Sequence, residues 1–446
     1  MRQATLLLSM AAFVAAAPAS QGIDFASVNA APSPATTGPA ASQSTHDVPY
    51  NSASVNAQGS AAATGVASAS ATASQVANSK RSFVWGWPWG SSPQKTTTQA
   101  AYPTTSTLSY SSSNTVSSIK ATSVPTTTSI PTTTTSQGSS VTTTTSSDTS
   151  CPTQPKAGTK CGSISPEDQC APQFDGYGPK ITPDTVDAFW AYPEFQQQAL
   201  AAQAPGYVAT FRNLNATVNA NTYLGLTTFK SYDAPLCAEY CNNKTLCTAF
   251  NLYVERDPSL NPSDNCTNPP SITNYKCTLW GSGVNTESAV NFGQYRSAFQ
   301  VVVAGSDGFE KTNITTPATQ PGWQPPKEAG GDGSKGHNHP STSIGNHFFP
   351  GPYNPALCAA YANSQNAINA KSPFWYKWIM FWMGQYNPYK CNFFNSYMLK
   401  KNGRPLGTYC GLYSQSYDAS YATYLPGWQG SDFWSIESSW SYDITN

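Results

Sequence analysis

"SYDAPLCAEYC" (residues 231–241) decides the fold, because a similar stretch, "PYNPALCAAYA", recurs at residues 352–362. Three more pairs follow in the same order along the chain: "CTAFNLY" (247–253) with "CNFFNSY" (391–397), "KCTLW" (276–280) with "YCGLY" (409–413), and "GQYRSAFQVVV" (293–303) with "GWQGSDFWSIE" (427–437). Matches that keep one order indicate an internal repeat. We therefore predict two copies of one fold, at residues 205–305 and 350–446.

The sequence of each copy predicts a short helix that packs on a sheet. Cys237 and Cys241 are four residues apart in an alanine-containing segment, which places both thiols on one face of a helix. The segments at 247–253 and 276–280 are aromatic and alternate apolar with polar residues, as antiparallel strands do. The fold class that we expect is therefore α+β.

The motifs Cys-x-x-x-Cys, Cys-x-x-Phe-Asn and Cys-x-Leu-Trp resemble those of PAN/apple domains. The flanking sequences are similar to secreted fungal proteins that carry tandem modules of this kind behind a Ser/Thr-rich stalk. The resemblance implies two disulfide-stapled PAN/apple-like modules, at residues 205–314 and 352–446. It also implies the disulfides Cys237–Cys277, Cys241–Cys247 and Cys358–Cys410.

The second copy lacks one of these cysteines, since Ala362 stands where the first copy has Cys241. Cys391 thereby loses its expected partner and is our candidate for a free thiol. Among the remaining cysteines, the pairing that we favour is Cys161–Cys170.

The beginning of the chain predicts secretion. Residues 1–19 combine Arg2, a short apolar run and small residues up to Ala19, as a signal peptide does, and the run is too short to span a membrane. All eleven cysteines lie at Cys151 or later. Cysteines in a secreted chain are typical of disulfides formed in an oxidising compartment. We expect a protein of the extracellular space or the cell wall, without a transmembrane segment.

Residues 20–150 are rich in Ala, Ser, Thr and Pro, and we predict a disordered, O-glycosylated stalk, with an unmodified linker as the alternative. Within this stretch, Lys80 and Arg81 resemble a dibasic processing site. Cleavage there would release residues 22–81 and leave "SFVWGWPWG" (82–90) at the new N-terminus. Its tryptophans are candidate binding residues: Trp85, Trp87 and Trp89.

Two further segments complete the predicted organisation. Residues 151–204 form a cysteine-containing lead-in, and residues 315–351 form a Pro/Gly-rich linker between the modules. Sequons for N-glycosylation begin at four asparagines in or beside the first module: Asn215, Asn243, Asn265 and Asn313. The second module has no sequon, so its surface is the one left free for contacts.

The second copy also carries an insertion, residues 363–390, with aromatic residues at helical spacing. Trp375, Trp378 and Trp382 belong to this stripe and are candidate binding aromatics. An exposed surface for a glycan, a lipid or a protein partner is one interpretation. Substitute packing for the missing disulfide is the interpretation that we favour, because large exposed apolar patches are unusual.

Catalytic motifs are not found, and we expect no enzymatic activity, no cofactor and no metal. The carboxylate pairs Glu255/Asp257 and Glu167/Asp168 are too close in sequence to flank a substrate cleft. His337 and His339 in "GHNHP" lack a third ligand nearby. A formal net charge of zero gives no support for nucleic-acid binding.

These observations predict a secreted, glycosylated, non-catalytic protein. Its modules would bind polysaccharide or an extracellular protein in or near a cell wall. The alternative is a freely secreted factor that acts on a host or on neighbouring cells, and an enzyme of unrecognised type is a third, less favoured possibility.

Overall fold

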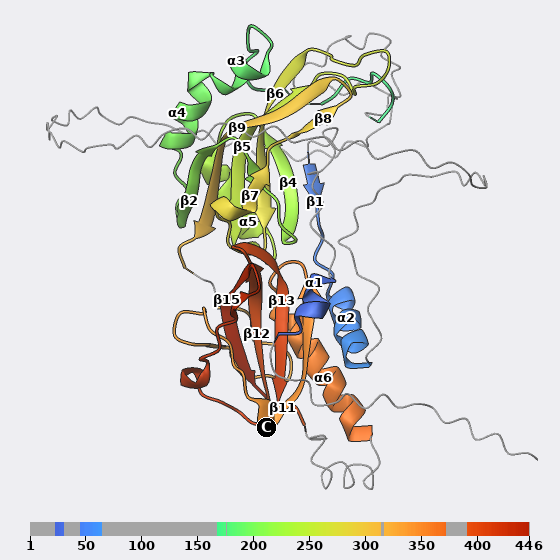
Figure 1. Cartoon of the computed structure of the whole chain (residues 1–446), viewed down its shortest axis with the longest axis vertical. Helices are drawn as coiled ribbons and strands as arrows, with labels where there is room; N and C mark the ends of the chain where they lie inside the picture. Colours follow the sequence, from blue (N-terminus) through green and yellow to red (C-terminus); the bar gives the residue numbers. More distant parts are fainter. Residues whose placement is uncertain are drawn as a thin grey trace, which may run out of the picture. The chain divides into compact units, whose positions relative to one another are not determined.

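The computed structural model describes residues 23–30, 45–64, 167–174, 176–313, 316–371 and 390–445. All of these residues belong to one compact unit, which combines helices with antiparallel sheets (Figure 1). No described helix is long and apolar enough to cross a membrane. We call residues 167–313 the first module and residues 316–445 the second module.

The first module is an antiparallel sheet with α5 against one face. Its elements are α3 (Val186–Trp190), α4 (Pro193–Ala201), β2 (Tyr207–Leu214), β3 (Thr217–Val218), β4 (Tyr223–Phe229), α5 (Ala234–Asn243), β5 (Ala249–Pro258), β6 (Ser271–Trp280), η1 (Thr286–Ser288), β7 (Ala289–Asn291), β8 (Gln294–Arg296) and β9 (Phe299–Lys311). The strand order is β1-β4-β6-β5-β9-β2, where β1 (Thr45–Asp47) comes from the N-terminal region. Strand β8 pairs with β9, and β3 with β7.

The second module has the same plan. Its elements are β10 (Lys327–Glu328), η2 (Pro340–Thr342), β11 (Ser343–Pro350), α6 (Pro355–Lys371), β12 (Phe393–Lys401), β13 (Arg404–Tyr413), η3 (Ala419–Tyr421), β14 (Gly427–Gln429) and β15 (Asp432–Asp443). The order β11-β13-β12-β15 repeats β4-β6-β5-β9, and the hairpin β14–β15 repeats β8–β9. The four sequence matches fall on α5 and α6, β5 and β12, β6 and β13, and the two hairpins, so the repeat is one of strand order as well as sequence.

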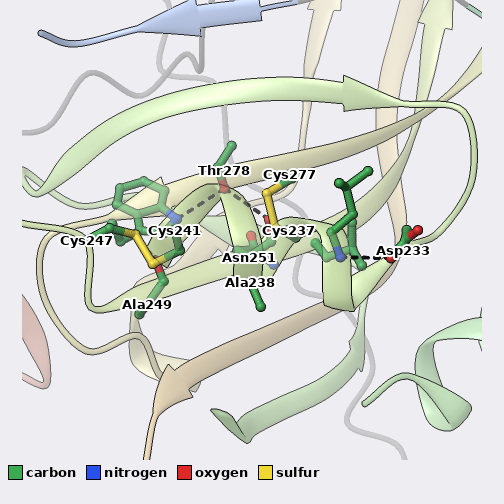
Figure 2. Close-up of a disulfide and its surroundings, with 12 residues drawn as sticks. Asp233, Cys237, Ala238, Cys241, Cys247, Ala249, Asn251, Cys277 and Thr278 are labelled. Carbon is green, nitrogen blue, oxygen red and sulfur yellow. Dashed lines mark hydrogen bonds between the residues drawn. A yellow bond between two sulfur atoms is a disulfide. The ribbon is translucent and has the colours of Figure 1, made fainter. Parts of the chain in front are cut away.

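Among the described residues, four disulfides are present. Cys237–Cys277 joins α5 to β6, and Cys241–Cys247 closes the end of α5 (Figure 2). Cys358–Cys410 joins α6 to β13. These are the pairs that the family resemblance implies. Cys391 is unpaired and buried, and burial raises the pKa of its thiol to about 12.

The fourth disulfide corrects the sequence prediction. Cys170 is bonded to Cys266, not to Cys161, which lies outside the described residues. The backbone N–H of Cys170 donates to the carbonyl of Asn261 at 3.0 Å, and Pro172 forms a bridge with Leu260. These backbone contacts place the segment beside the loop that carries Cys266, a neighbour that spacing along the chain cannot indicate.

Two predicted connecting segments belong to the modules. The predicted linker, 315–351, supplies edge strand β11 and buries Trp323 and His337 in the second module. The lead-in, 151–204, supplies α3 and α4, which bury Phe189 and Phe195 in the core of the first module. The aromatic side chains of these segments thus join the cores of the two modules.

Part of the predicted disordered stalk has regular structure. It contains α1 (Phe25–Asn29), β1 and α2 (Ser52–Thr64), which contact elements of the two modules (Figure 1). Small residues such as Ala and Ser are compatible with helices that pack closely. Several predicted functional residues lie outside the described residues: Lys80, Arg81, Trp85, Trp87, Trp89, Trp375, Trp378 and Trp382.

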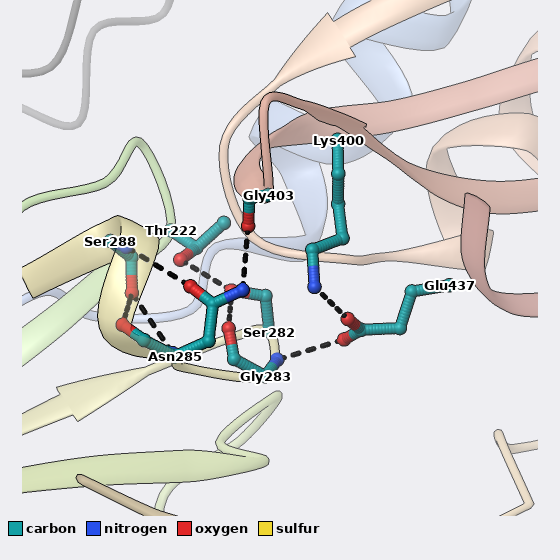
Figure 3. Close-up of polar contacts among 8 residues, drawn as sticks. All are labelled: Thr222, Ser282, Gly283, Asn285, Ser288, Lys400, Gly403 and Glu437. Atoms are coloured by element: carbon teal, nitrogen blue, oxygen red, sulfur yellow. Dashed lines mark hydrogen bonds and ion pairs between the residues drawn. The ribbon is translucent and has the colours of Figure 1, made fainter. Parts of the chain in front are cut away.

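Polar contacts join the two modules (Figure 3). The Glu437 carboxylate accepts hydrogen bonds from the Gly283 backbone N–H at 2.9 Å and from Lys400 at 2.7 Å. The side chain of Asn285 donates to the carbonyl of Gly403 at 3.0 Å. Both Glu437 and Glu310 approach Gly283, where a β-carbon would lie under 3.0 Å from a carboxylate oxygen of each. A side chain at position 283 would therefore displace the carboxylate ends of these two glutamates.

Candidate functional site

Each sheet has one face against its module's helix and an opposite face, which we call the far face. In the second module, Phe394 and Met398 pack in one cluster with residues of α6, while Tyr397 and Tyr409 pack in a separate cluster on the far face. This separation follows from the alternation of side chains along a strand.

A buried asparagine organises the far face of the second module. Asn395, from the repeated Cys-x-x-Phe-Asn motif, donates to the carbonyl of Trp440 at 3.0 Å and to the hydroxyl of Ser439 at 3.0 Å. Its side-chain oxygen accepts from the backbone N–H of His337 at 2.9 Å. The asparagine thus ties β12 to β15 and to the segment that crosses the face.

Asn251 does the same in the first module. It donates to the carbonyl of Asp307 at 2.8 Å and to the hydroxyl of Ser306 at 2.9 Å, and it accepts from the backbone N–H of Val218 at 2.9 Å. The equivalence assigns a structural role to the asparagine of both motifs. It also shows that residues around His337 correspond in position to β3.

The far face of the first module contains a buried ion cluster. Lys276 lies 2.6 Å from the carboxylate of Asp257 and also contacts that of Glu255, while Asn274 donates to Asp257 at 2.8 Å. Burial and the neighbouring Asp257 charge raise the pKa of Glu255 to about 7. Burial opposes the charge of Lys276, but the two carboxylates raise its pKa overall. Glu255 and Asp257, which both lie on β5, therefore form ion pairs with the same lysine, Lys276.

The far face of the second module has tyrosines instead of charges. Tyr409 stands where the first module has Lys276, and Gly411 where it has Thr278. A cavity of about 20 Å³, room for about one water molecule, remains there. Its lining residues are Ile23, His337, Gly345, Asn346, Tyr397, Tyr409, Gly411, Tyr413 and Tyr424. We call this site the tyrosine recess.

Histidines and aromatic rings stack beside the recess. His337 and His339 share a hydrogen bond of 3.0 Å between Nδ1 and Nε2, and His339 stacks on Tyr417 with ring centroids 3.6 Å apart. Burial, together with the neighbouring His339, lowers the pKa of His337 to about 4, so this imidazole is neutral at ordinary pH. In the described part of the chain, no group of three or more His, Cys, Asp or Glu side chains could hold a metal ion. The ring contacts of His337 with Phe393 and of His339 with Tyr413 and Tyr417 show that both histidines take part in aromatic packing.

An exposed aromatic patch lies on the β14–β15 hairpin. Trp428 is 68% exposed and Phe433 is 41% exposed, and their ring centroids are 5.3 Å apart. Leu425, on the same connection, is also exposed. We call these three residues the hairpin patch. Exposing a large aromatic side chain gives up the free energy of burial, so such a patch suggests a contact surface.

Polar side chains surround the hairpin patch. Asn402 donates to Asp432 at 2.9 Å and accepts from the backbone N–H of Phe433 at 2.8 Å. Lys401 forms an ion pair with Asp432 at 2.9 Å. These contacts join the β14–β15 hairpin to the β12–β13 turn and thereby fix the position of the strands that carry Trp428 and Phe433.

The equivalent hairpin of the first module also exposes aromatic rings, those of Phe292 and Tyr295. The first module, however, carries the predicted glycosylation sites, and all four asparagines are exposed: Asn215, Asn243, Asn265 and Asn313. Carbohydrate on these side chains would share the surface of this module. The second module's hairpin has no sequon around it.

The sequence contains a signal for the hairpin patch. "GWQGSDFW" (427–434) places aromatic residues on both sides of a Gly-containing turn, which brings Trp428 opposite Phe433 in the hairpin. Glu167 and Asp168, the other carboxylate pair of the sequence, lie away from this patch. Their backbone carbonyls accept hydrogen bonds from the side chain of Asn261.

Comparison of the chain with models of protein families, with curated proteins and with solved structures finds no match.

Proposed function

We propose that this protein is a secreted, glycosylated, non-catalytic binding protein of the cell wall or the extracellular space, built from two PAN/apple-like modules. The matching strand order of the two modules supports this proposal, as do the helix-to-strand disulfides Cys237–Cys277 and Cys358–Cys410. Disulfides of this kind are stable in an oxidising compartment. The four exposed sequon asparagines are accessible to glycosylation.

The ligand that we propose is a polysaccharide, bound at the hairpin patch. The observation that carries this proposal is the exposed ring of Trp428, in contact with Phe433 and rimmed by polar groups. A flat ring can stack on the apolar C–H face of a sugar, while polar neighbours can hydrogen-bond its hydroxyl groups. Sites of this composition recognise ligands without relying on charge.

A protein ligand is less well supported at this patch. Stable protein interfaces bury about 800 Å² on each partner, with some 20–30 residues a side. The hairpin patch consists of Leu425, Trp428 and Phe433. A short stack of sugar rings matches such a small, flat surface better than a protein does.

The test is retention of the purified protein on insoluble chitin, β-glucan and mannan. We expect binding to at least one of them, and Trp428→Ala should weaken it by about 2 kcal/mol, or roughly 30-fold in Kd. Tyr421→Ala is the matched control, because it removes an exposed aromatic ring outside the patch. Absence of the wild-type protein from all three polymers would rule out the polysaccharide ligand, and equal losses in the two variants would rule out the patch.

A further inference from the structure

Residues 23–30 and 45–64, which we call the strap, make contacts at three separate places on the modules. They are the elements α1, β1 and α2 in Figure 1. The contacts differ in kind at the three places: side-chain burial, strand pairing and helix packing.

The first contact closes the tyrosine recess. Ile23 and Val28 are buried in one cluster with Tyr397 and Tyr409, and Ile23 lines the recess itself. The backbone N–H of Asp24 donates to the Tyr409 hydroxyl at 3.2 Å. The cavity of about 20 Å³ is therefore the space that remains with the strap in place.

The second contact extends the sheet of the first module. Strand β1 pairs antiparallel with β4, with His46 opposite Leu226 and Asp47 opposite Gly225. A β-carbon at Gly225 would lie 2.8 Å from the carbonyl oxygen of His46, so this glycine allows the close approach of the strap. Lys244 pairs with Asp47. Pairing of this kind also covers a strand edge that could otherwise join another chain.

The third contact packs α2 against α6. Gly59 is buried, and a β-carbon there would lie 2.5 Å from the β-carbon of Ala360. The hydroxyls of Ser60 and Ser364 share a hydrogen bond of 2.9 Å, and Val55 is buried in the core cluster of the second module. Small residues at the contact let the two helices approach closely.

We propose that the strap is a non-covalently bound third part of the folded unit, which closes the tyrosine recess and stays in place when the chain between Thr64 and Glu167 is cut. Residues 1–150 contain no cysteine, so no disulfide can hold the strap. Two glycines, Gly59 in the strap and Gly225 in the first module, are shaped for this contact from both sides. The inference does not depend on the polysaccharide ligand.

The strap changes the expected outcome of processing. Lys80 and Arg81 follow the strap in sequence and precede the modules. From the sequence alone, cleavage there would release residues 22–81. With the strap bound at three places, the same cleavage gives two chains that remain together.

The test uses the full chain with a site-specific protease sequence inserted after Ala100. After cutting, we expect the N-terminal fragment to co-elute with the modules in size-exclusion chromatography and to separate in denaturing gels without reductant. Gly59→Val should reduce this retention about tenfold or more, because the added side chain has no room against Ala360.

Ala57→Val is the control, since it places the same side chain at an exposed position of the same helix. It should leave retention unchanged. Loss of the wild-type fragment on cutting under native conditions would overturn the proposal. Equal retention of the Gly59→Val and Ala57→Val fragments would overturn the assigned helix contact. Either result is independent of binding to chitin, β-glucan or mannan.

Discussion

The far faces of the two modules are built on the same strands and the same asparagine, but they are filled differently. In the first module, Lys276 and its two carboxylates fill the face with paired charges. In the second, Tyr409 takes the place of Lys276 and Gly411 that of Thr278, and the strap closes the remaining space. The two modules therefore share a backbone arrangement and differ in their side chains. The far face of the first module is filled by its own side chains, whereas that of the second is covered by the strap.

The largest effect on the free energy of unfolding should come from removing a disulfide of the second module. Among the described residues, the second module has only Cys358–Cys410, whereas the first keeps other cross-links when one is removed. The chain-entropy estimate for the 52-residue separation is about 4 kcal/mol. Replacing Cys358 and Cys410 by alanine should lower the free energy of unfolding of the second module by about that amount, measured by urea denaturation.

Cys241→Ala with Cys247→Ala is the matched control in the first module. Its separation of 6 residues closes a short loop, for which the same estimate gives about 2 kcal/mol. A cost as large as that of the Cys358/Cys410 variant would contradict the assignment of the main cross-link to the helix-to-strand bond.

The second largest effect should follow from breaking the ion cluster. Lys276→Met leaves Glu255 and Asp257 buried without their cation, and losing one partner of a buried pair costs about 3–5 kcal/mol. Because burial and the neighbouring Asp257 charge raise the pKa of Glu255 to about 7, this carboxyl takes up a proton as the pH falls, so we expect about 3 kcal/mol at neutral pH and less at pH 5. Urea denaturation at the two pH values measures this. A cost that does not fall at pH 5 would show that the buried charges are not its cause.

The modules should also respond to pH in opposite directions. Burial raises the pKa of Asp307 and of Glu310 to about 7, with the Glu437 charge adding to the shift of Glu310. These carboxyls bind protons more tightly in the folded state than in the unfolded state. Their contribution to stability is therefore full below about pH 4 and is lost as pH rises through 7.

In the second module, burial, then the neighbouring His339, lowers the pKa of His337 to about 4. Its contribution is full above about pH 6.5 and is lost as pH falls through 4.

Calorimetry between pH 5 and pH 7.5 measures this contrast. Lowering the pH should raise the transition temperature of the first module and lower that of the second. Asp307→Asn should reduce the pH dependence of the first transition and leave that of the second unchanged. Two transitions that move together would contradict the opposite shifts.

The smallest effect is expected at the position equivalent to Lys276. Tyr409→Phe removes the hydroxyl that accepts from Asp24 and keeps the ring, so it should cost about 1 kcal/mol. Urea denaturation of Tyr409→Phe beside Lys276→Met makes the comparison at one position of the repeat. A loss from Tyr409→Phe as large as that from Lys276→Met would mean that the two faces do not differ in the way described.

The repeat made much of the fold predictable. Because Cys237 and Cys358 occupy matching helices, one alignment indicated the helix, the central strands and the closing hairpin of both modules. The pairing of Cys170 with Cys266 could not be predicted in this way, since it depends on a segment that reaches its partner through backbone contacts with the 259–266 loop.

The strap was not predictable from composition. An Ala/Ser-rich segment such as 52–64 has few apolar side chains of its own, and it becomes ordered because α6 offers Ala360 and Ser364 at close range. The hairpin patch was not predictable for another reason. Trp428 and Phe433 belong to a strand motif that predicts packing, and only the hairpin geometry shows that both rings face outward.

The most direct test of the contrast between the far faces is tyrosine nitration, mapped by mass spectrometry, on the protease-cut protein with and without the strap. Tyr253 and Tyr397 occupy equivalent positions of the repeat and are both buried. Removing the strap with the Gly59→Val variant should make Tyr397 and Tyr409 reactive, while Tyr253 stays protected. If Tyr397 and Tyr409 stay as protected as Tyr253, or if all three become reactive together, the strap does not cover a recess that is specific to the second module.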